Sequence, residues 1–176
     1  MASFVGANAA NSDNSTNLVT VSAPPHSNGN FLIQFIGYAD NTLDSVSNGL
    51  ATEITLVNDA AAFDTAVQVA WQTASSEPAV YSVSCDDALT DHQCIIMAAF
   101  ENIASAPFDI AYNSADHYVK QTNTASPQAQ PITASADGGL ALVFQYVTES
   151  NVTDLVAPSG YSEAAQTLGN HRNAGS

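Results

Sequence analysis

Short apolar runs, separated by turn residues, follow one another along most of the chain. In "TAVQVAWQT", residues 65–73, Val67, Val69 and Trp71 alternate with small or polar residues, which is the period-two pattern of a half-buried strand. Similar runs predict strands at 18–21, 31–38, 53–57, 79–85, 94–100 and 139–148, and a short one at Ile132. Helical patterns are limited to a turn or two at 59–63 and 162–168. The pattern therefore predicts an all-β fold, an antiparallel β-sandwich or jelly roll.

Two of the runs are apolar on both faces. Run 31–38, "FLIQFIGY", has Gln34 as its one polar member, and run 139–148 repeats the pattern. The outer face of a sandwich strand meets water unless it is covered. The cover is either a loop of the same chain, for which residues 101–131 are available, or a neighbouring subunit. The candidate interface residues are Phe4, Val5, Leu32, Ile36 and Tyr38. The predicted core comprises Phe31, Ile33, Phe35, Val67, Val69, Trp71, Ile96, Phe100 and Phe144.

The chain divides into three parts. Residues 1–16 are small and polar apart from Phe4 and Val5, so they are predicted to form an extended N-terminal arm. Such a segment has too little apolar surface to offset its ordering entropy alone, and we expect it to lie along another chain. Residues 17–168 form the predicted sandwich domain, and residues 169–176 form a polar C-terminal tail.

Charge limits the partners that the chain can have. Lys and Arg together number 2 and Asp and Glu together number 17, which gives a formal net charge of −15. Two cations cannot form a phosphate-binding surface, and an anionic membrane is disfavoured for the same reason. The N-terminus lacks the features of a secretory signal, and no run has the roughly 18 apolar residues of a membrane helix. We expect no nucleic-acid or membrane partner, and synthesis in a cytoplasm without a signal peptide.

The two cysteines are the first candidate for special chemistry. Cys85 and Cys94 end adjacent apolar runs, so in a hairpin they would lie at the mouth of the loop. Two readings stay open, a disulfide across a short loop and two free thiols.

Catalytic and metal sites are not predicted. The acidic loop between the cysteines resembles a solvated hairpin tip more than a calcium loop, because its spacing is not that of an EF-hand. The four candidate carboxylates of a glycosidase are scattered over run ends, namely Glu53, Glu77, Glu101 and Glu149. No serine-hydrolase or nucleotide-binding motif is present. We therefore expect a protein that is not an enzyme, with no catalytic residue, cofactor or metal.

Several segments, taken in order, resemble a known family. "VSAPPHSNGNFLIQFIGYAD", "AVQVAWQTASSEPAVYSVSC", "CIIMAAFENIASAPFD", "ITASADGGLALVFQYV" and "APSGYSEAAQT" resemble segments of tailed-phage and prophage β-sandwich virion proteins of concanavalin-like, tail-fibre-like or capsid-decoration-like type. The resemblance covers about residues 18–168. Gly29-Asn30 stands where the family has Gly-Asp, and two strands usually follow the "PSGY" turn. Three explanations stay open for those strands: a trimmed sandwich, a partner that supplies them, or a chain that continues.

The resemblance implies a function in a virus particle. It implies a non-enzymatic structural component of a bacteriophage virion, a capsid decoration or cement protein or a head or tail fibre or spike subunit. The expected partners are other virion proteins, with a homo-oligomer as the expected state. The alternative is a lectin-like module that binds glycans on a host surface. Weak candidates for sugar contact lie in the long loop: Tyr112, Asn113, Asp116 and Tyr118.

Overall fold

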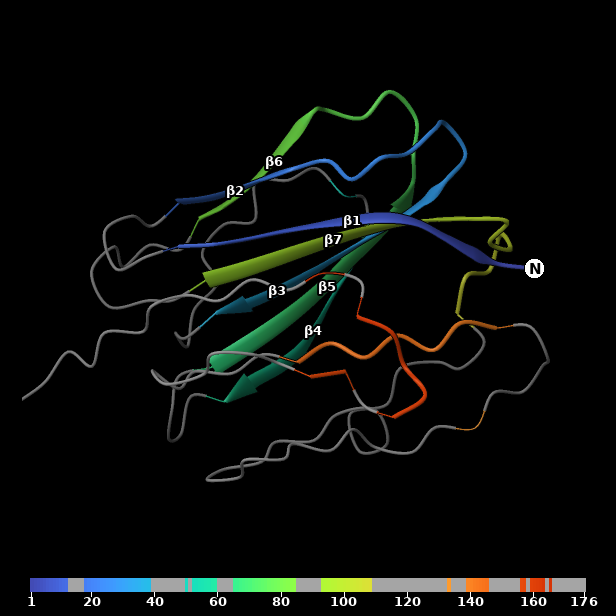
Figure 1. The fold of residues 1–176 in the computed structure, drawn as a ribbon. Helices are drawn as coiled ribbons and strands as arrows, with labels where there is room; N and C mark the ends of the chain where they lie inside the picture. The colour runs from blue at the N-terminus through green and yellow to red at the C-terminus, as the bar shows by residue number, and fades with distance from the viewer. Residues whose placement is uncertain are drawn as a thin grey trace, which may run out of the picture.

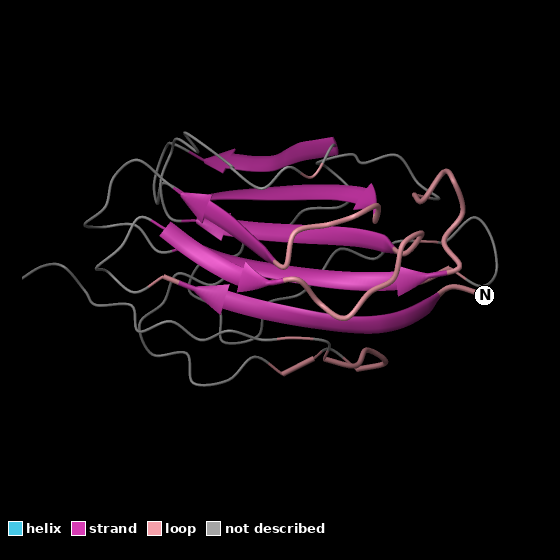
Figure 2. Cartoon of the chain, turned by 90° about the horizontal axis from the view of Figure 1, so that it is seen from above, coloured by secondary structure: helices cyan, strands magenta, loops and turns pink. Residues whose placement is uncertain are grey.

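The computed structural model describes residues 1–12, 18–38, 50, 52–59, 65–84, 93–108, 133, 139–145, 156–157, 159–163 and 165. Every regular element in these residues is a β-strand, and all strand pairs are antiparallel (Figures 1 and 2). The predicted all-β class is therefore confirmed. The described residues contain no helix with the length and apolarity needed to cross a bilayer.

Five strands form the larger sheet, in the order β1-β7-β3-β5-β4. Their bounds are β1 Ser3–Asn11, β3 Phe31–Tyr38, β4 Thr52–Asp59, β5 Thr65–Thr73 and β7 Gln93–Glu101. Strand β3 lies at the centre and pairs along its whole length with β5 on one side and β7 on the other. A second sheet pairs β2 (Leu18–Ser22) with β6 (Val80–Ser84).

The deepest packing lies between the two sheets. Alternate residues of β2 and β6 meet alternate residues of β3, β5 and β7 there, as the strand period requires. We call this cluster the inter-sheet core; its members are Val19, Val21, Ile36, Leu50, Ala70, Tyr81, Val83, Ile95 and Met97. Three glutamines on the same strand faces are also buried: Gln34, Gln68 and Gln93.

A second cluster covers the opposite face of the larger sheet. We call it the outer cluster; its buried members are Phe31, Ile33, Val69, Ala98 and Phe100. Segments that follow the strands lie against it. The ring of Phe144 stacks on Phe35 with a centroid distance of 4.9 Å, and the ring of Phe108 meets Trp71 edge-to-face at 4.8 Å. Strand β3 is thus apolar on both faces because both faces are packed.

The six predicted strands from residue 18 to residue 100 correspond to β2–β7. The other predicted elements are not observed as strands or helices in the described residues. Residues 139–145 form no strand, although Phe144 does pack on the sheet as a core residue. The helical turn expected at 162–168 is absent from its described residues 162, 163 and 165. Residue 132 and residues 60–63 lie outside the described part.

The N-terminal segment is not an arm along another chain. Residues Ser3–Asn11 form β1, which pairs with β7 of the same chain. A bulge between Phe4 and Gly6 shifts the register, and Val5 packs against the buried Leu32. A Cβ on Gly6 would stand 3.0 Å from Cδ of Pro25, so this close approach favours glycine.

Two proposed interface residues are core residues instead. Leu32 and Ile36 are both 0% exposed within the chain. Ile36 belongs to the inter-sheet core, and Leu32 forms a small cluster with Ala74 and Ala99, against which Val5 packs. The predicted core residues Phe31, Ile33, Val69 and Phe100 do share one buried cluster. That cluster lies on the opposite face of β3, however, and the sequence did not reveal that a second core lies between the sheets.

Truncation of Ile36 tests the inter-sheet core. Ile36→Ala should lower the free energy of unfolding by about 2–5 kcal/mol, because it leaves a cavity between two sheets. Val80→Ala is the matched control, since Val80 is 51% exposed on β6 and should change stability by less than about 0.5 kcal/mol. Urea denaturation of both variants measures the difference. Equal losses for the two variants would contradict this packing.

Candidate functional site

Two turns meet at one end of the larger sheet and are joined by backbone hydrogen bonds. The first, residues 23–30, leads into β3, and the second, residues 74–79, connects β5 to β6. The Ala74 amide donates to the Asn30 carbonyl at 2.7 Å, and the Gly29 amide donates to the Ala74 carbonyl at 2.9 Å. Gly29 has a φ of 90°, a conformation that glycine adopts without steric cost. The turns therefore hold each other in a fixed arrangement.

Glu77 is the charged residue of this region, and both of its carboxylate oxygens accept hydrogen bonds. Oε1 accepts from the Ser75 amide at 2.9 Å, and Oε2 accepts from the Tyr81 hydroxyl at 2.8 Å. Tyr81 is 1% exposed and belongs to the inter-sheet core. The hydrogen bond thus connects the turn to the inter-sheet core.

The protonation of both partners reflects this contact. Partial burial by itself raises the pKa of Glu77, but hydrogen bonds from Ser75 and Tyr81 outweigh it. A hydrogen bond from Gln72 and the electrostatic effect of His26 act in the same direction, so the pKa of Glu77 lies below its ordinary value. Burial, followed by the contact with Glu77, raises the pKa of Tyr81. At neutral pH the pair is therefore a phenol donating to a carboxylate.

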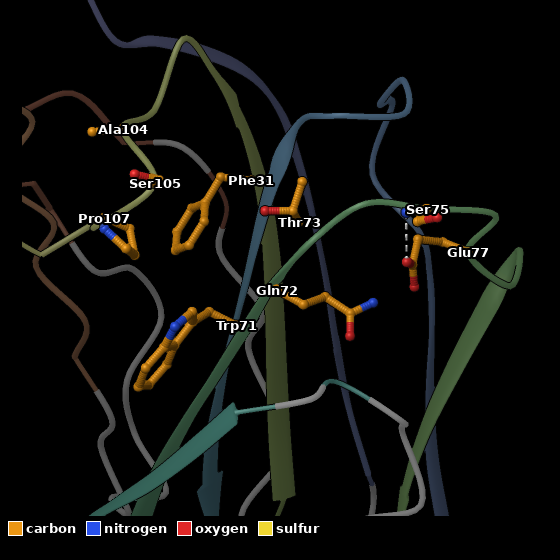
Figure 3. Close-up of a pocket in the computed structure, with 9 residues that line it drawn as sticks. All are labelled: Phe31, Trp71, Gln72, Thr73, Ser75, Glu77, Ala104, Ser105 and Pro107. Carbon is orange, nitrogen blue, oxygen red and sulfur yellow. Dashed lines mark hydrogen bonds between the residues drawn. The ribbon is translucent and has the colours of Figure 1, made fainter.

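A groove of about 540 Å³ opens beside these turns. Figure 3 shows the side chains of Phe31, Trp71 and Pro107 gathered on one side, with those of Gln72 and Glu77 pointing to the other. The nine described residues that line it are Phe31, Trp71, Gln72, Thr73, Ser75, Glu77, Ala104, Ser105 and Pro107. The groove therefore has an apolar wall and a polar wall, with Glu77 as the one ionisable residue of this set.

Trp71 departs from its predicted place. We expected it within the core, and its strand and face are as predicted. The side chain is only partly buried, however, and it lines the groove. The reason is that the segment after β7, which includes Phe108, covers the indole incompletely. Sequence alternation assigned the face of this residue, but it could not show where the cover ends.

Cys94 is a free thiol, which favours the second reading of the cysteine pair. Burial raises the pKa of Cys94 to about 12, although a hydrogen bond with the Gly37 backbone lowers it in part. A thiol that stays protonated at neutral pH is a poor nucleophile, so Cys94 is not a candidate catalytic residue. Cys85 lies outside the described residues.

Several predicted residues cannot be placed. The sugar candidates Tyr112, Asn113, Asp116 and Tyr118, and the acidic loop, lie outside the described residues, as does the side chain of Tyr38. Of the interface candidates, Phe4 is 49% exposed and its ring meets Phe100 edge-to-face at 5.7 Å. Among the described side chains, no group of three or more His, Cys, Asp and Glu is placed to hold a metal.

Comparison with known proteins gives no relative. No family model, curated protein or solved structure matches this chain. The resemblance to phage virion proteins therefore stays a prediction.

The Glu77–Tyr81 pair makes stability depend on pH. Because the pKa of Glu77 is lowered in the folded protein, its ionised form contributes stability above the unfolded carboxyl pKa of about 4.3. That contribution is lost as the pH falls through the lower folded pKa. We expect Glu77→Gln to be less stable than the wild type at pH 7, with the difference shrinking below about pH 4.

Denaturant titrations between neutral and acidic pH measure this convergence. Tyr81→Phe is the matched control, because it removes the hydroxyl and keeps the buried ring. In the Tyr81→Phe background, Glu77→Gln should cost less stability at neutral pH, as expected for two coupled groups. Additive losses that do not change with pH would exclude the coupling.

Proposed function

We propose that this chain is a non-enzymatic structural component of a bacteriophage virion, built as a β-sandwich of jelly-roll type. It acts through protein–protein contacts, as a capsid decoration or cement protein or as a fibre or spike subunit. The sandwich is supported by the core that the two sheets share. The place in a virion rests on the order of the sequence segments described above.

One observation carries the proposed mode of action, namely the apolar side chains that remain exposed over the outer cluster. Phe4 and Phe108 contact rings of that cluster and are 49% and 45% exposed. Leu140 and Leu142, in the segment that leads to Phe144, are also exposed. In Figure 1 this segment runs along the face of the larger sheet opposite β2 and β6. Exposed apolar side chains of this kind are typical of a protein contact.

Charge sets the character of such a contact. Because Lys and Arg together number only 2 in the whole chain, ion pairs between copies can contribute little to the free energy of association. A net charge of −15 makes identical copies repel at low ionic strength, and salt screens this repulsion. The proposed contacts are therefore hydrophobic and hydrogen-bonded, and they should persist or strengthen as salt is added.

Light scattering of the purified chain, at low and high salt, tests the proposal. We expect an oligomer whose mass is maintained or increases with salt. Leu140→Gln should weaken association, because it places an amide in the contact. Val80→Gln is the matched control, since Val80 is equally exposed but lies on β6, away from the outer cluster.

Mass spectrometry of purified virus particles tests the virion assignment. The particles are taken from cells that carry the gene for this chain in its natural genomic context. The chain should be present at a fixed ratio to the other particle proteins. A monomer at every salt concentration, together with absence from particles, would overturn the proposed function.

A further inference from the structure

The groove beside Trp71 has a chemical character that the proposed structural function does not require. Its apolar wall contains the indole of Trp71 and the ring of Phe31, and its polar wall contains hydroxyl, amide and carboxylate groups (Figure 3). A volume of about 540 Å³ lies within the range of roughly 300–1,000 Å³ common for small-ligand sites. We propose that this groove binds a neutral saccharide, with a sugar ring packed against Trp71.

The apolar wall suits one face of a sugar ring. A pyranose presents C–H groups on a face and hydroxyls around its rim, so it pairs with an aromatic ring flanked by polar groups. Trp71 lines the groove and is only partly buried. Its edge-to-face contact with Phe108 at 4.8 Å restrains the indole before a ligand arrives, which lowers the entropic cost of binding.

The polar wall suits the hydroxyls. Thr73 and Ser75 are exposed residues of this wall, while the exposed Ser105 lies beside Pro107 on the other side of the groove (Figure 3). Each of these hydroxyls can donate or accept a hydrogen bond. The hydrogen bonds that join the two turns hold this wall in place. Polar groups preorganised in this way bind with less loss of freedom than groups on a loose loop.

Charge selects a neutral ligand over an ionic one. The nine lining residues include no Lys or Arg, and Glu77 is an ionised carboxylate among them, so an anionic sugar would be repelled. Both oxygens of Glu77 already accept hydrogen bonds from Ser75 and Tyr81. Hydroxyl and amide side chains outnumber this one carboxylate in the lining, so a ligand with hydroxyls alone matches the polar groups best.

Trp71 is the one tryptophan of the chain, so its fluorescence reports on the groove directly. We would titrate the full chain with maltohexaose, cellohexaose, chitohexaose and mannohexaose as neutral probes. Polygalacturonate and spermidine serve as the anionic and cationic probes. The expected result is a saturable change in emission with at least one neutral probe, and none with either ionic probe.

Two variants locate the binding. Thr73→Ala should weaken it about fivefold, the loss of one net hydrogen bond, and Ser105→Gln should weaken it further by filling the groove. Thr20→Ala is the matched control, because Thr20 is an exposed threonine on β2, outside the groove. Thermal melting of each variant verifies folding.

The inference is overturned if no neutral probe changes the emission, or if an ionic probe binds as well as the neutral ones. It is also overturned if Thr73→Ala and Thr20→Ala behave alike. None of these readouts depends on assembly, so failure of the saccharide site is distinguishable from failure of the proposed virion function.

Discussion

Strand β3 lies at the centre of the larger sheet, and both of its faces must be kept from water. Leu32 and Ile36 on one face are fully buried, with Ile36 in the inter-sheet core, while Phe31 and Ile33 belong to the cluster on the other face. This double requirement explains why a second sheet packs on one side. It also explains why the segments after β7 and around Phe144 lie on the other. A face covered by loops is covered less completely than one covered by a sheet, and exposed apolar residues such as Phe4 and Phe108 lie there.

The candidate site depends on the same arrangement. Trp71 lies opposite Ile33 in the register between β5 and β3, on the face that loops cover. The polar wall begins where β5 ends and the chain turns towards β6. Through Tyr81, that turn is bonded to the core between the sheets. A change in the packing between the sheets would therefore shift the position of Glu77. This holds although the groove is lined by strand ends and turns, and not by the middle of either sheet.

Strands with strong alternation could be predicted from the sequence, and those with small side chains could not. The pattern in β5 fixed both its bounds and the face of Trp71. Strand β1 has the sequence "SFVGANAAN", which carries little apolar signal, and it is held instead by backbone pairing and by side-chain contacts such as the Asn8 Nδ2 bond to the Ala23 carbonyl at 3.0 Å. Leu32 and Ile36 were misassigned because an apolar pattern shows that a face is covered, not which chain covers it. The groove depends on where a loop stops, which no local pattern encodes.

The pairing of β1 with β7 has a consequence for synthesis. Ser3 lies opposite Glu101, so β1 is synthesised well before β7, the strand that pairs with it. Until β7 has been synthesised, the backbone groups of β1 have no partner strand, and the β1 edge of the larger sheet cannot form. Pairings so distant in sequence form slowly because a long loop must close first. During this interval the unpaired backbone groups of β1 favour aggregation, and the acidic, base-poor composition would keep neighbouring chains apart.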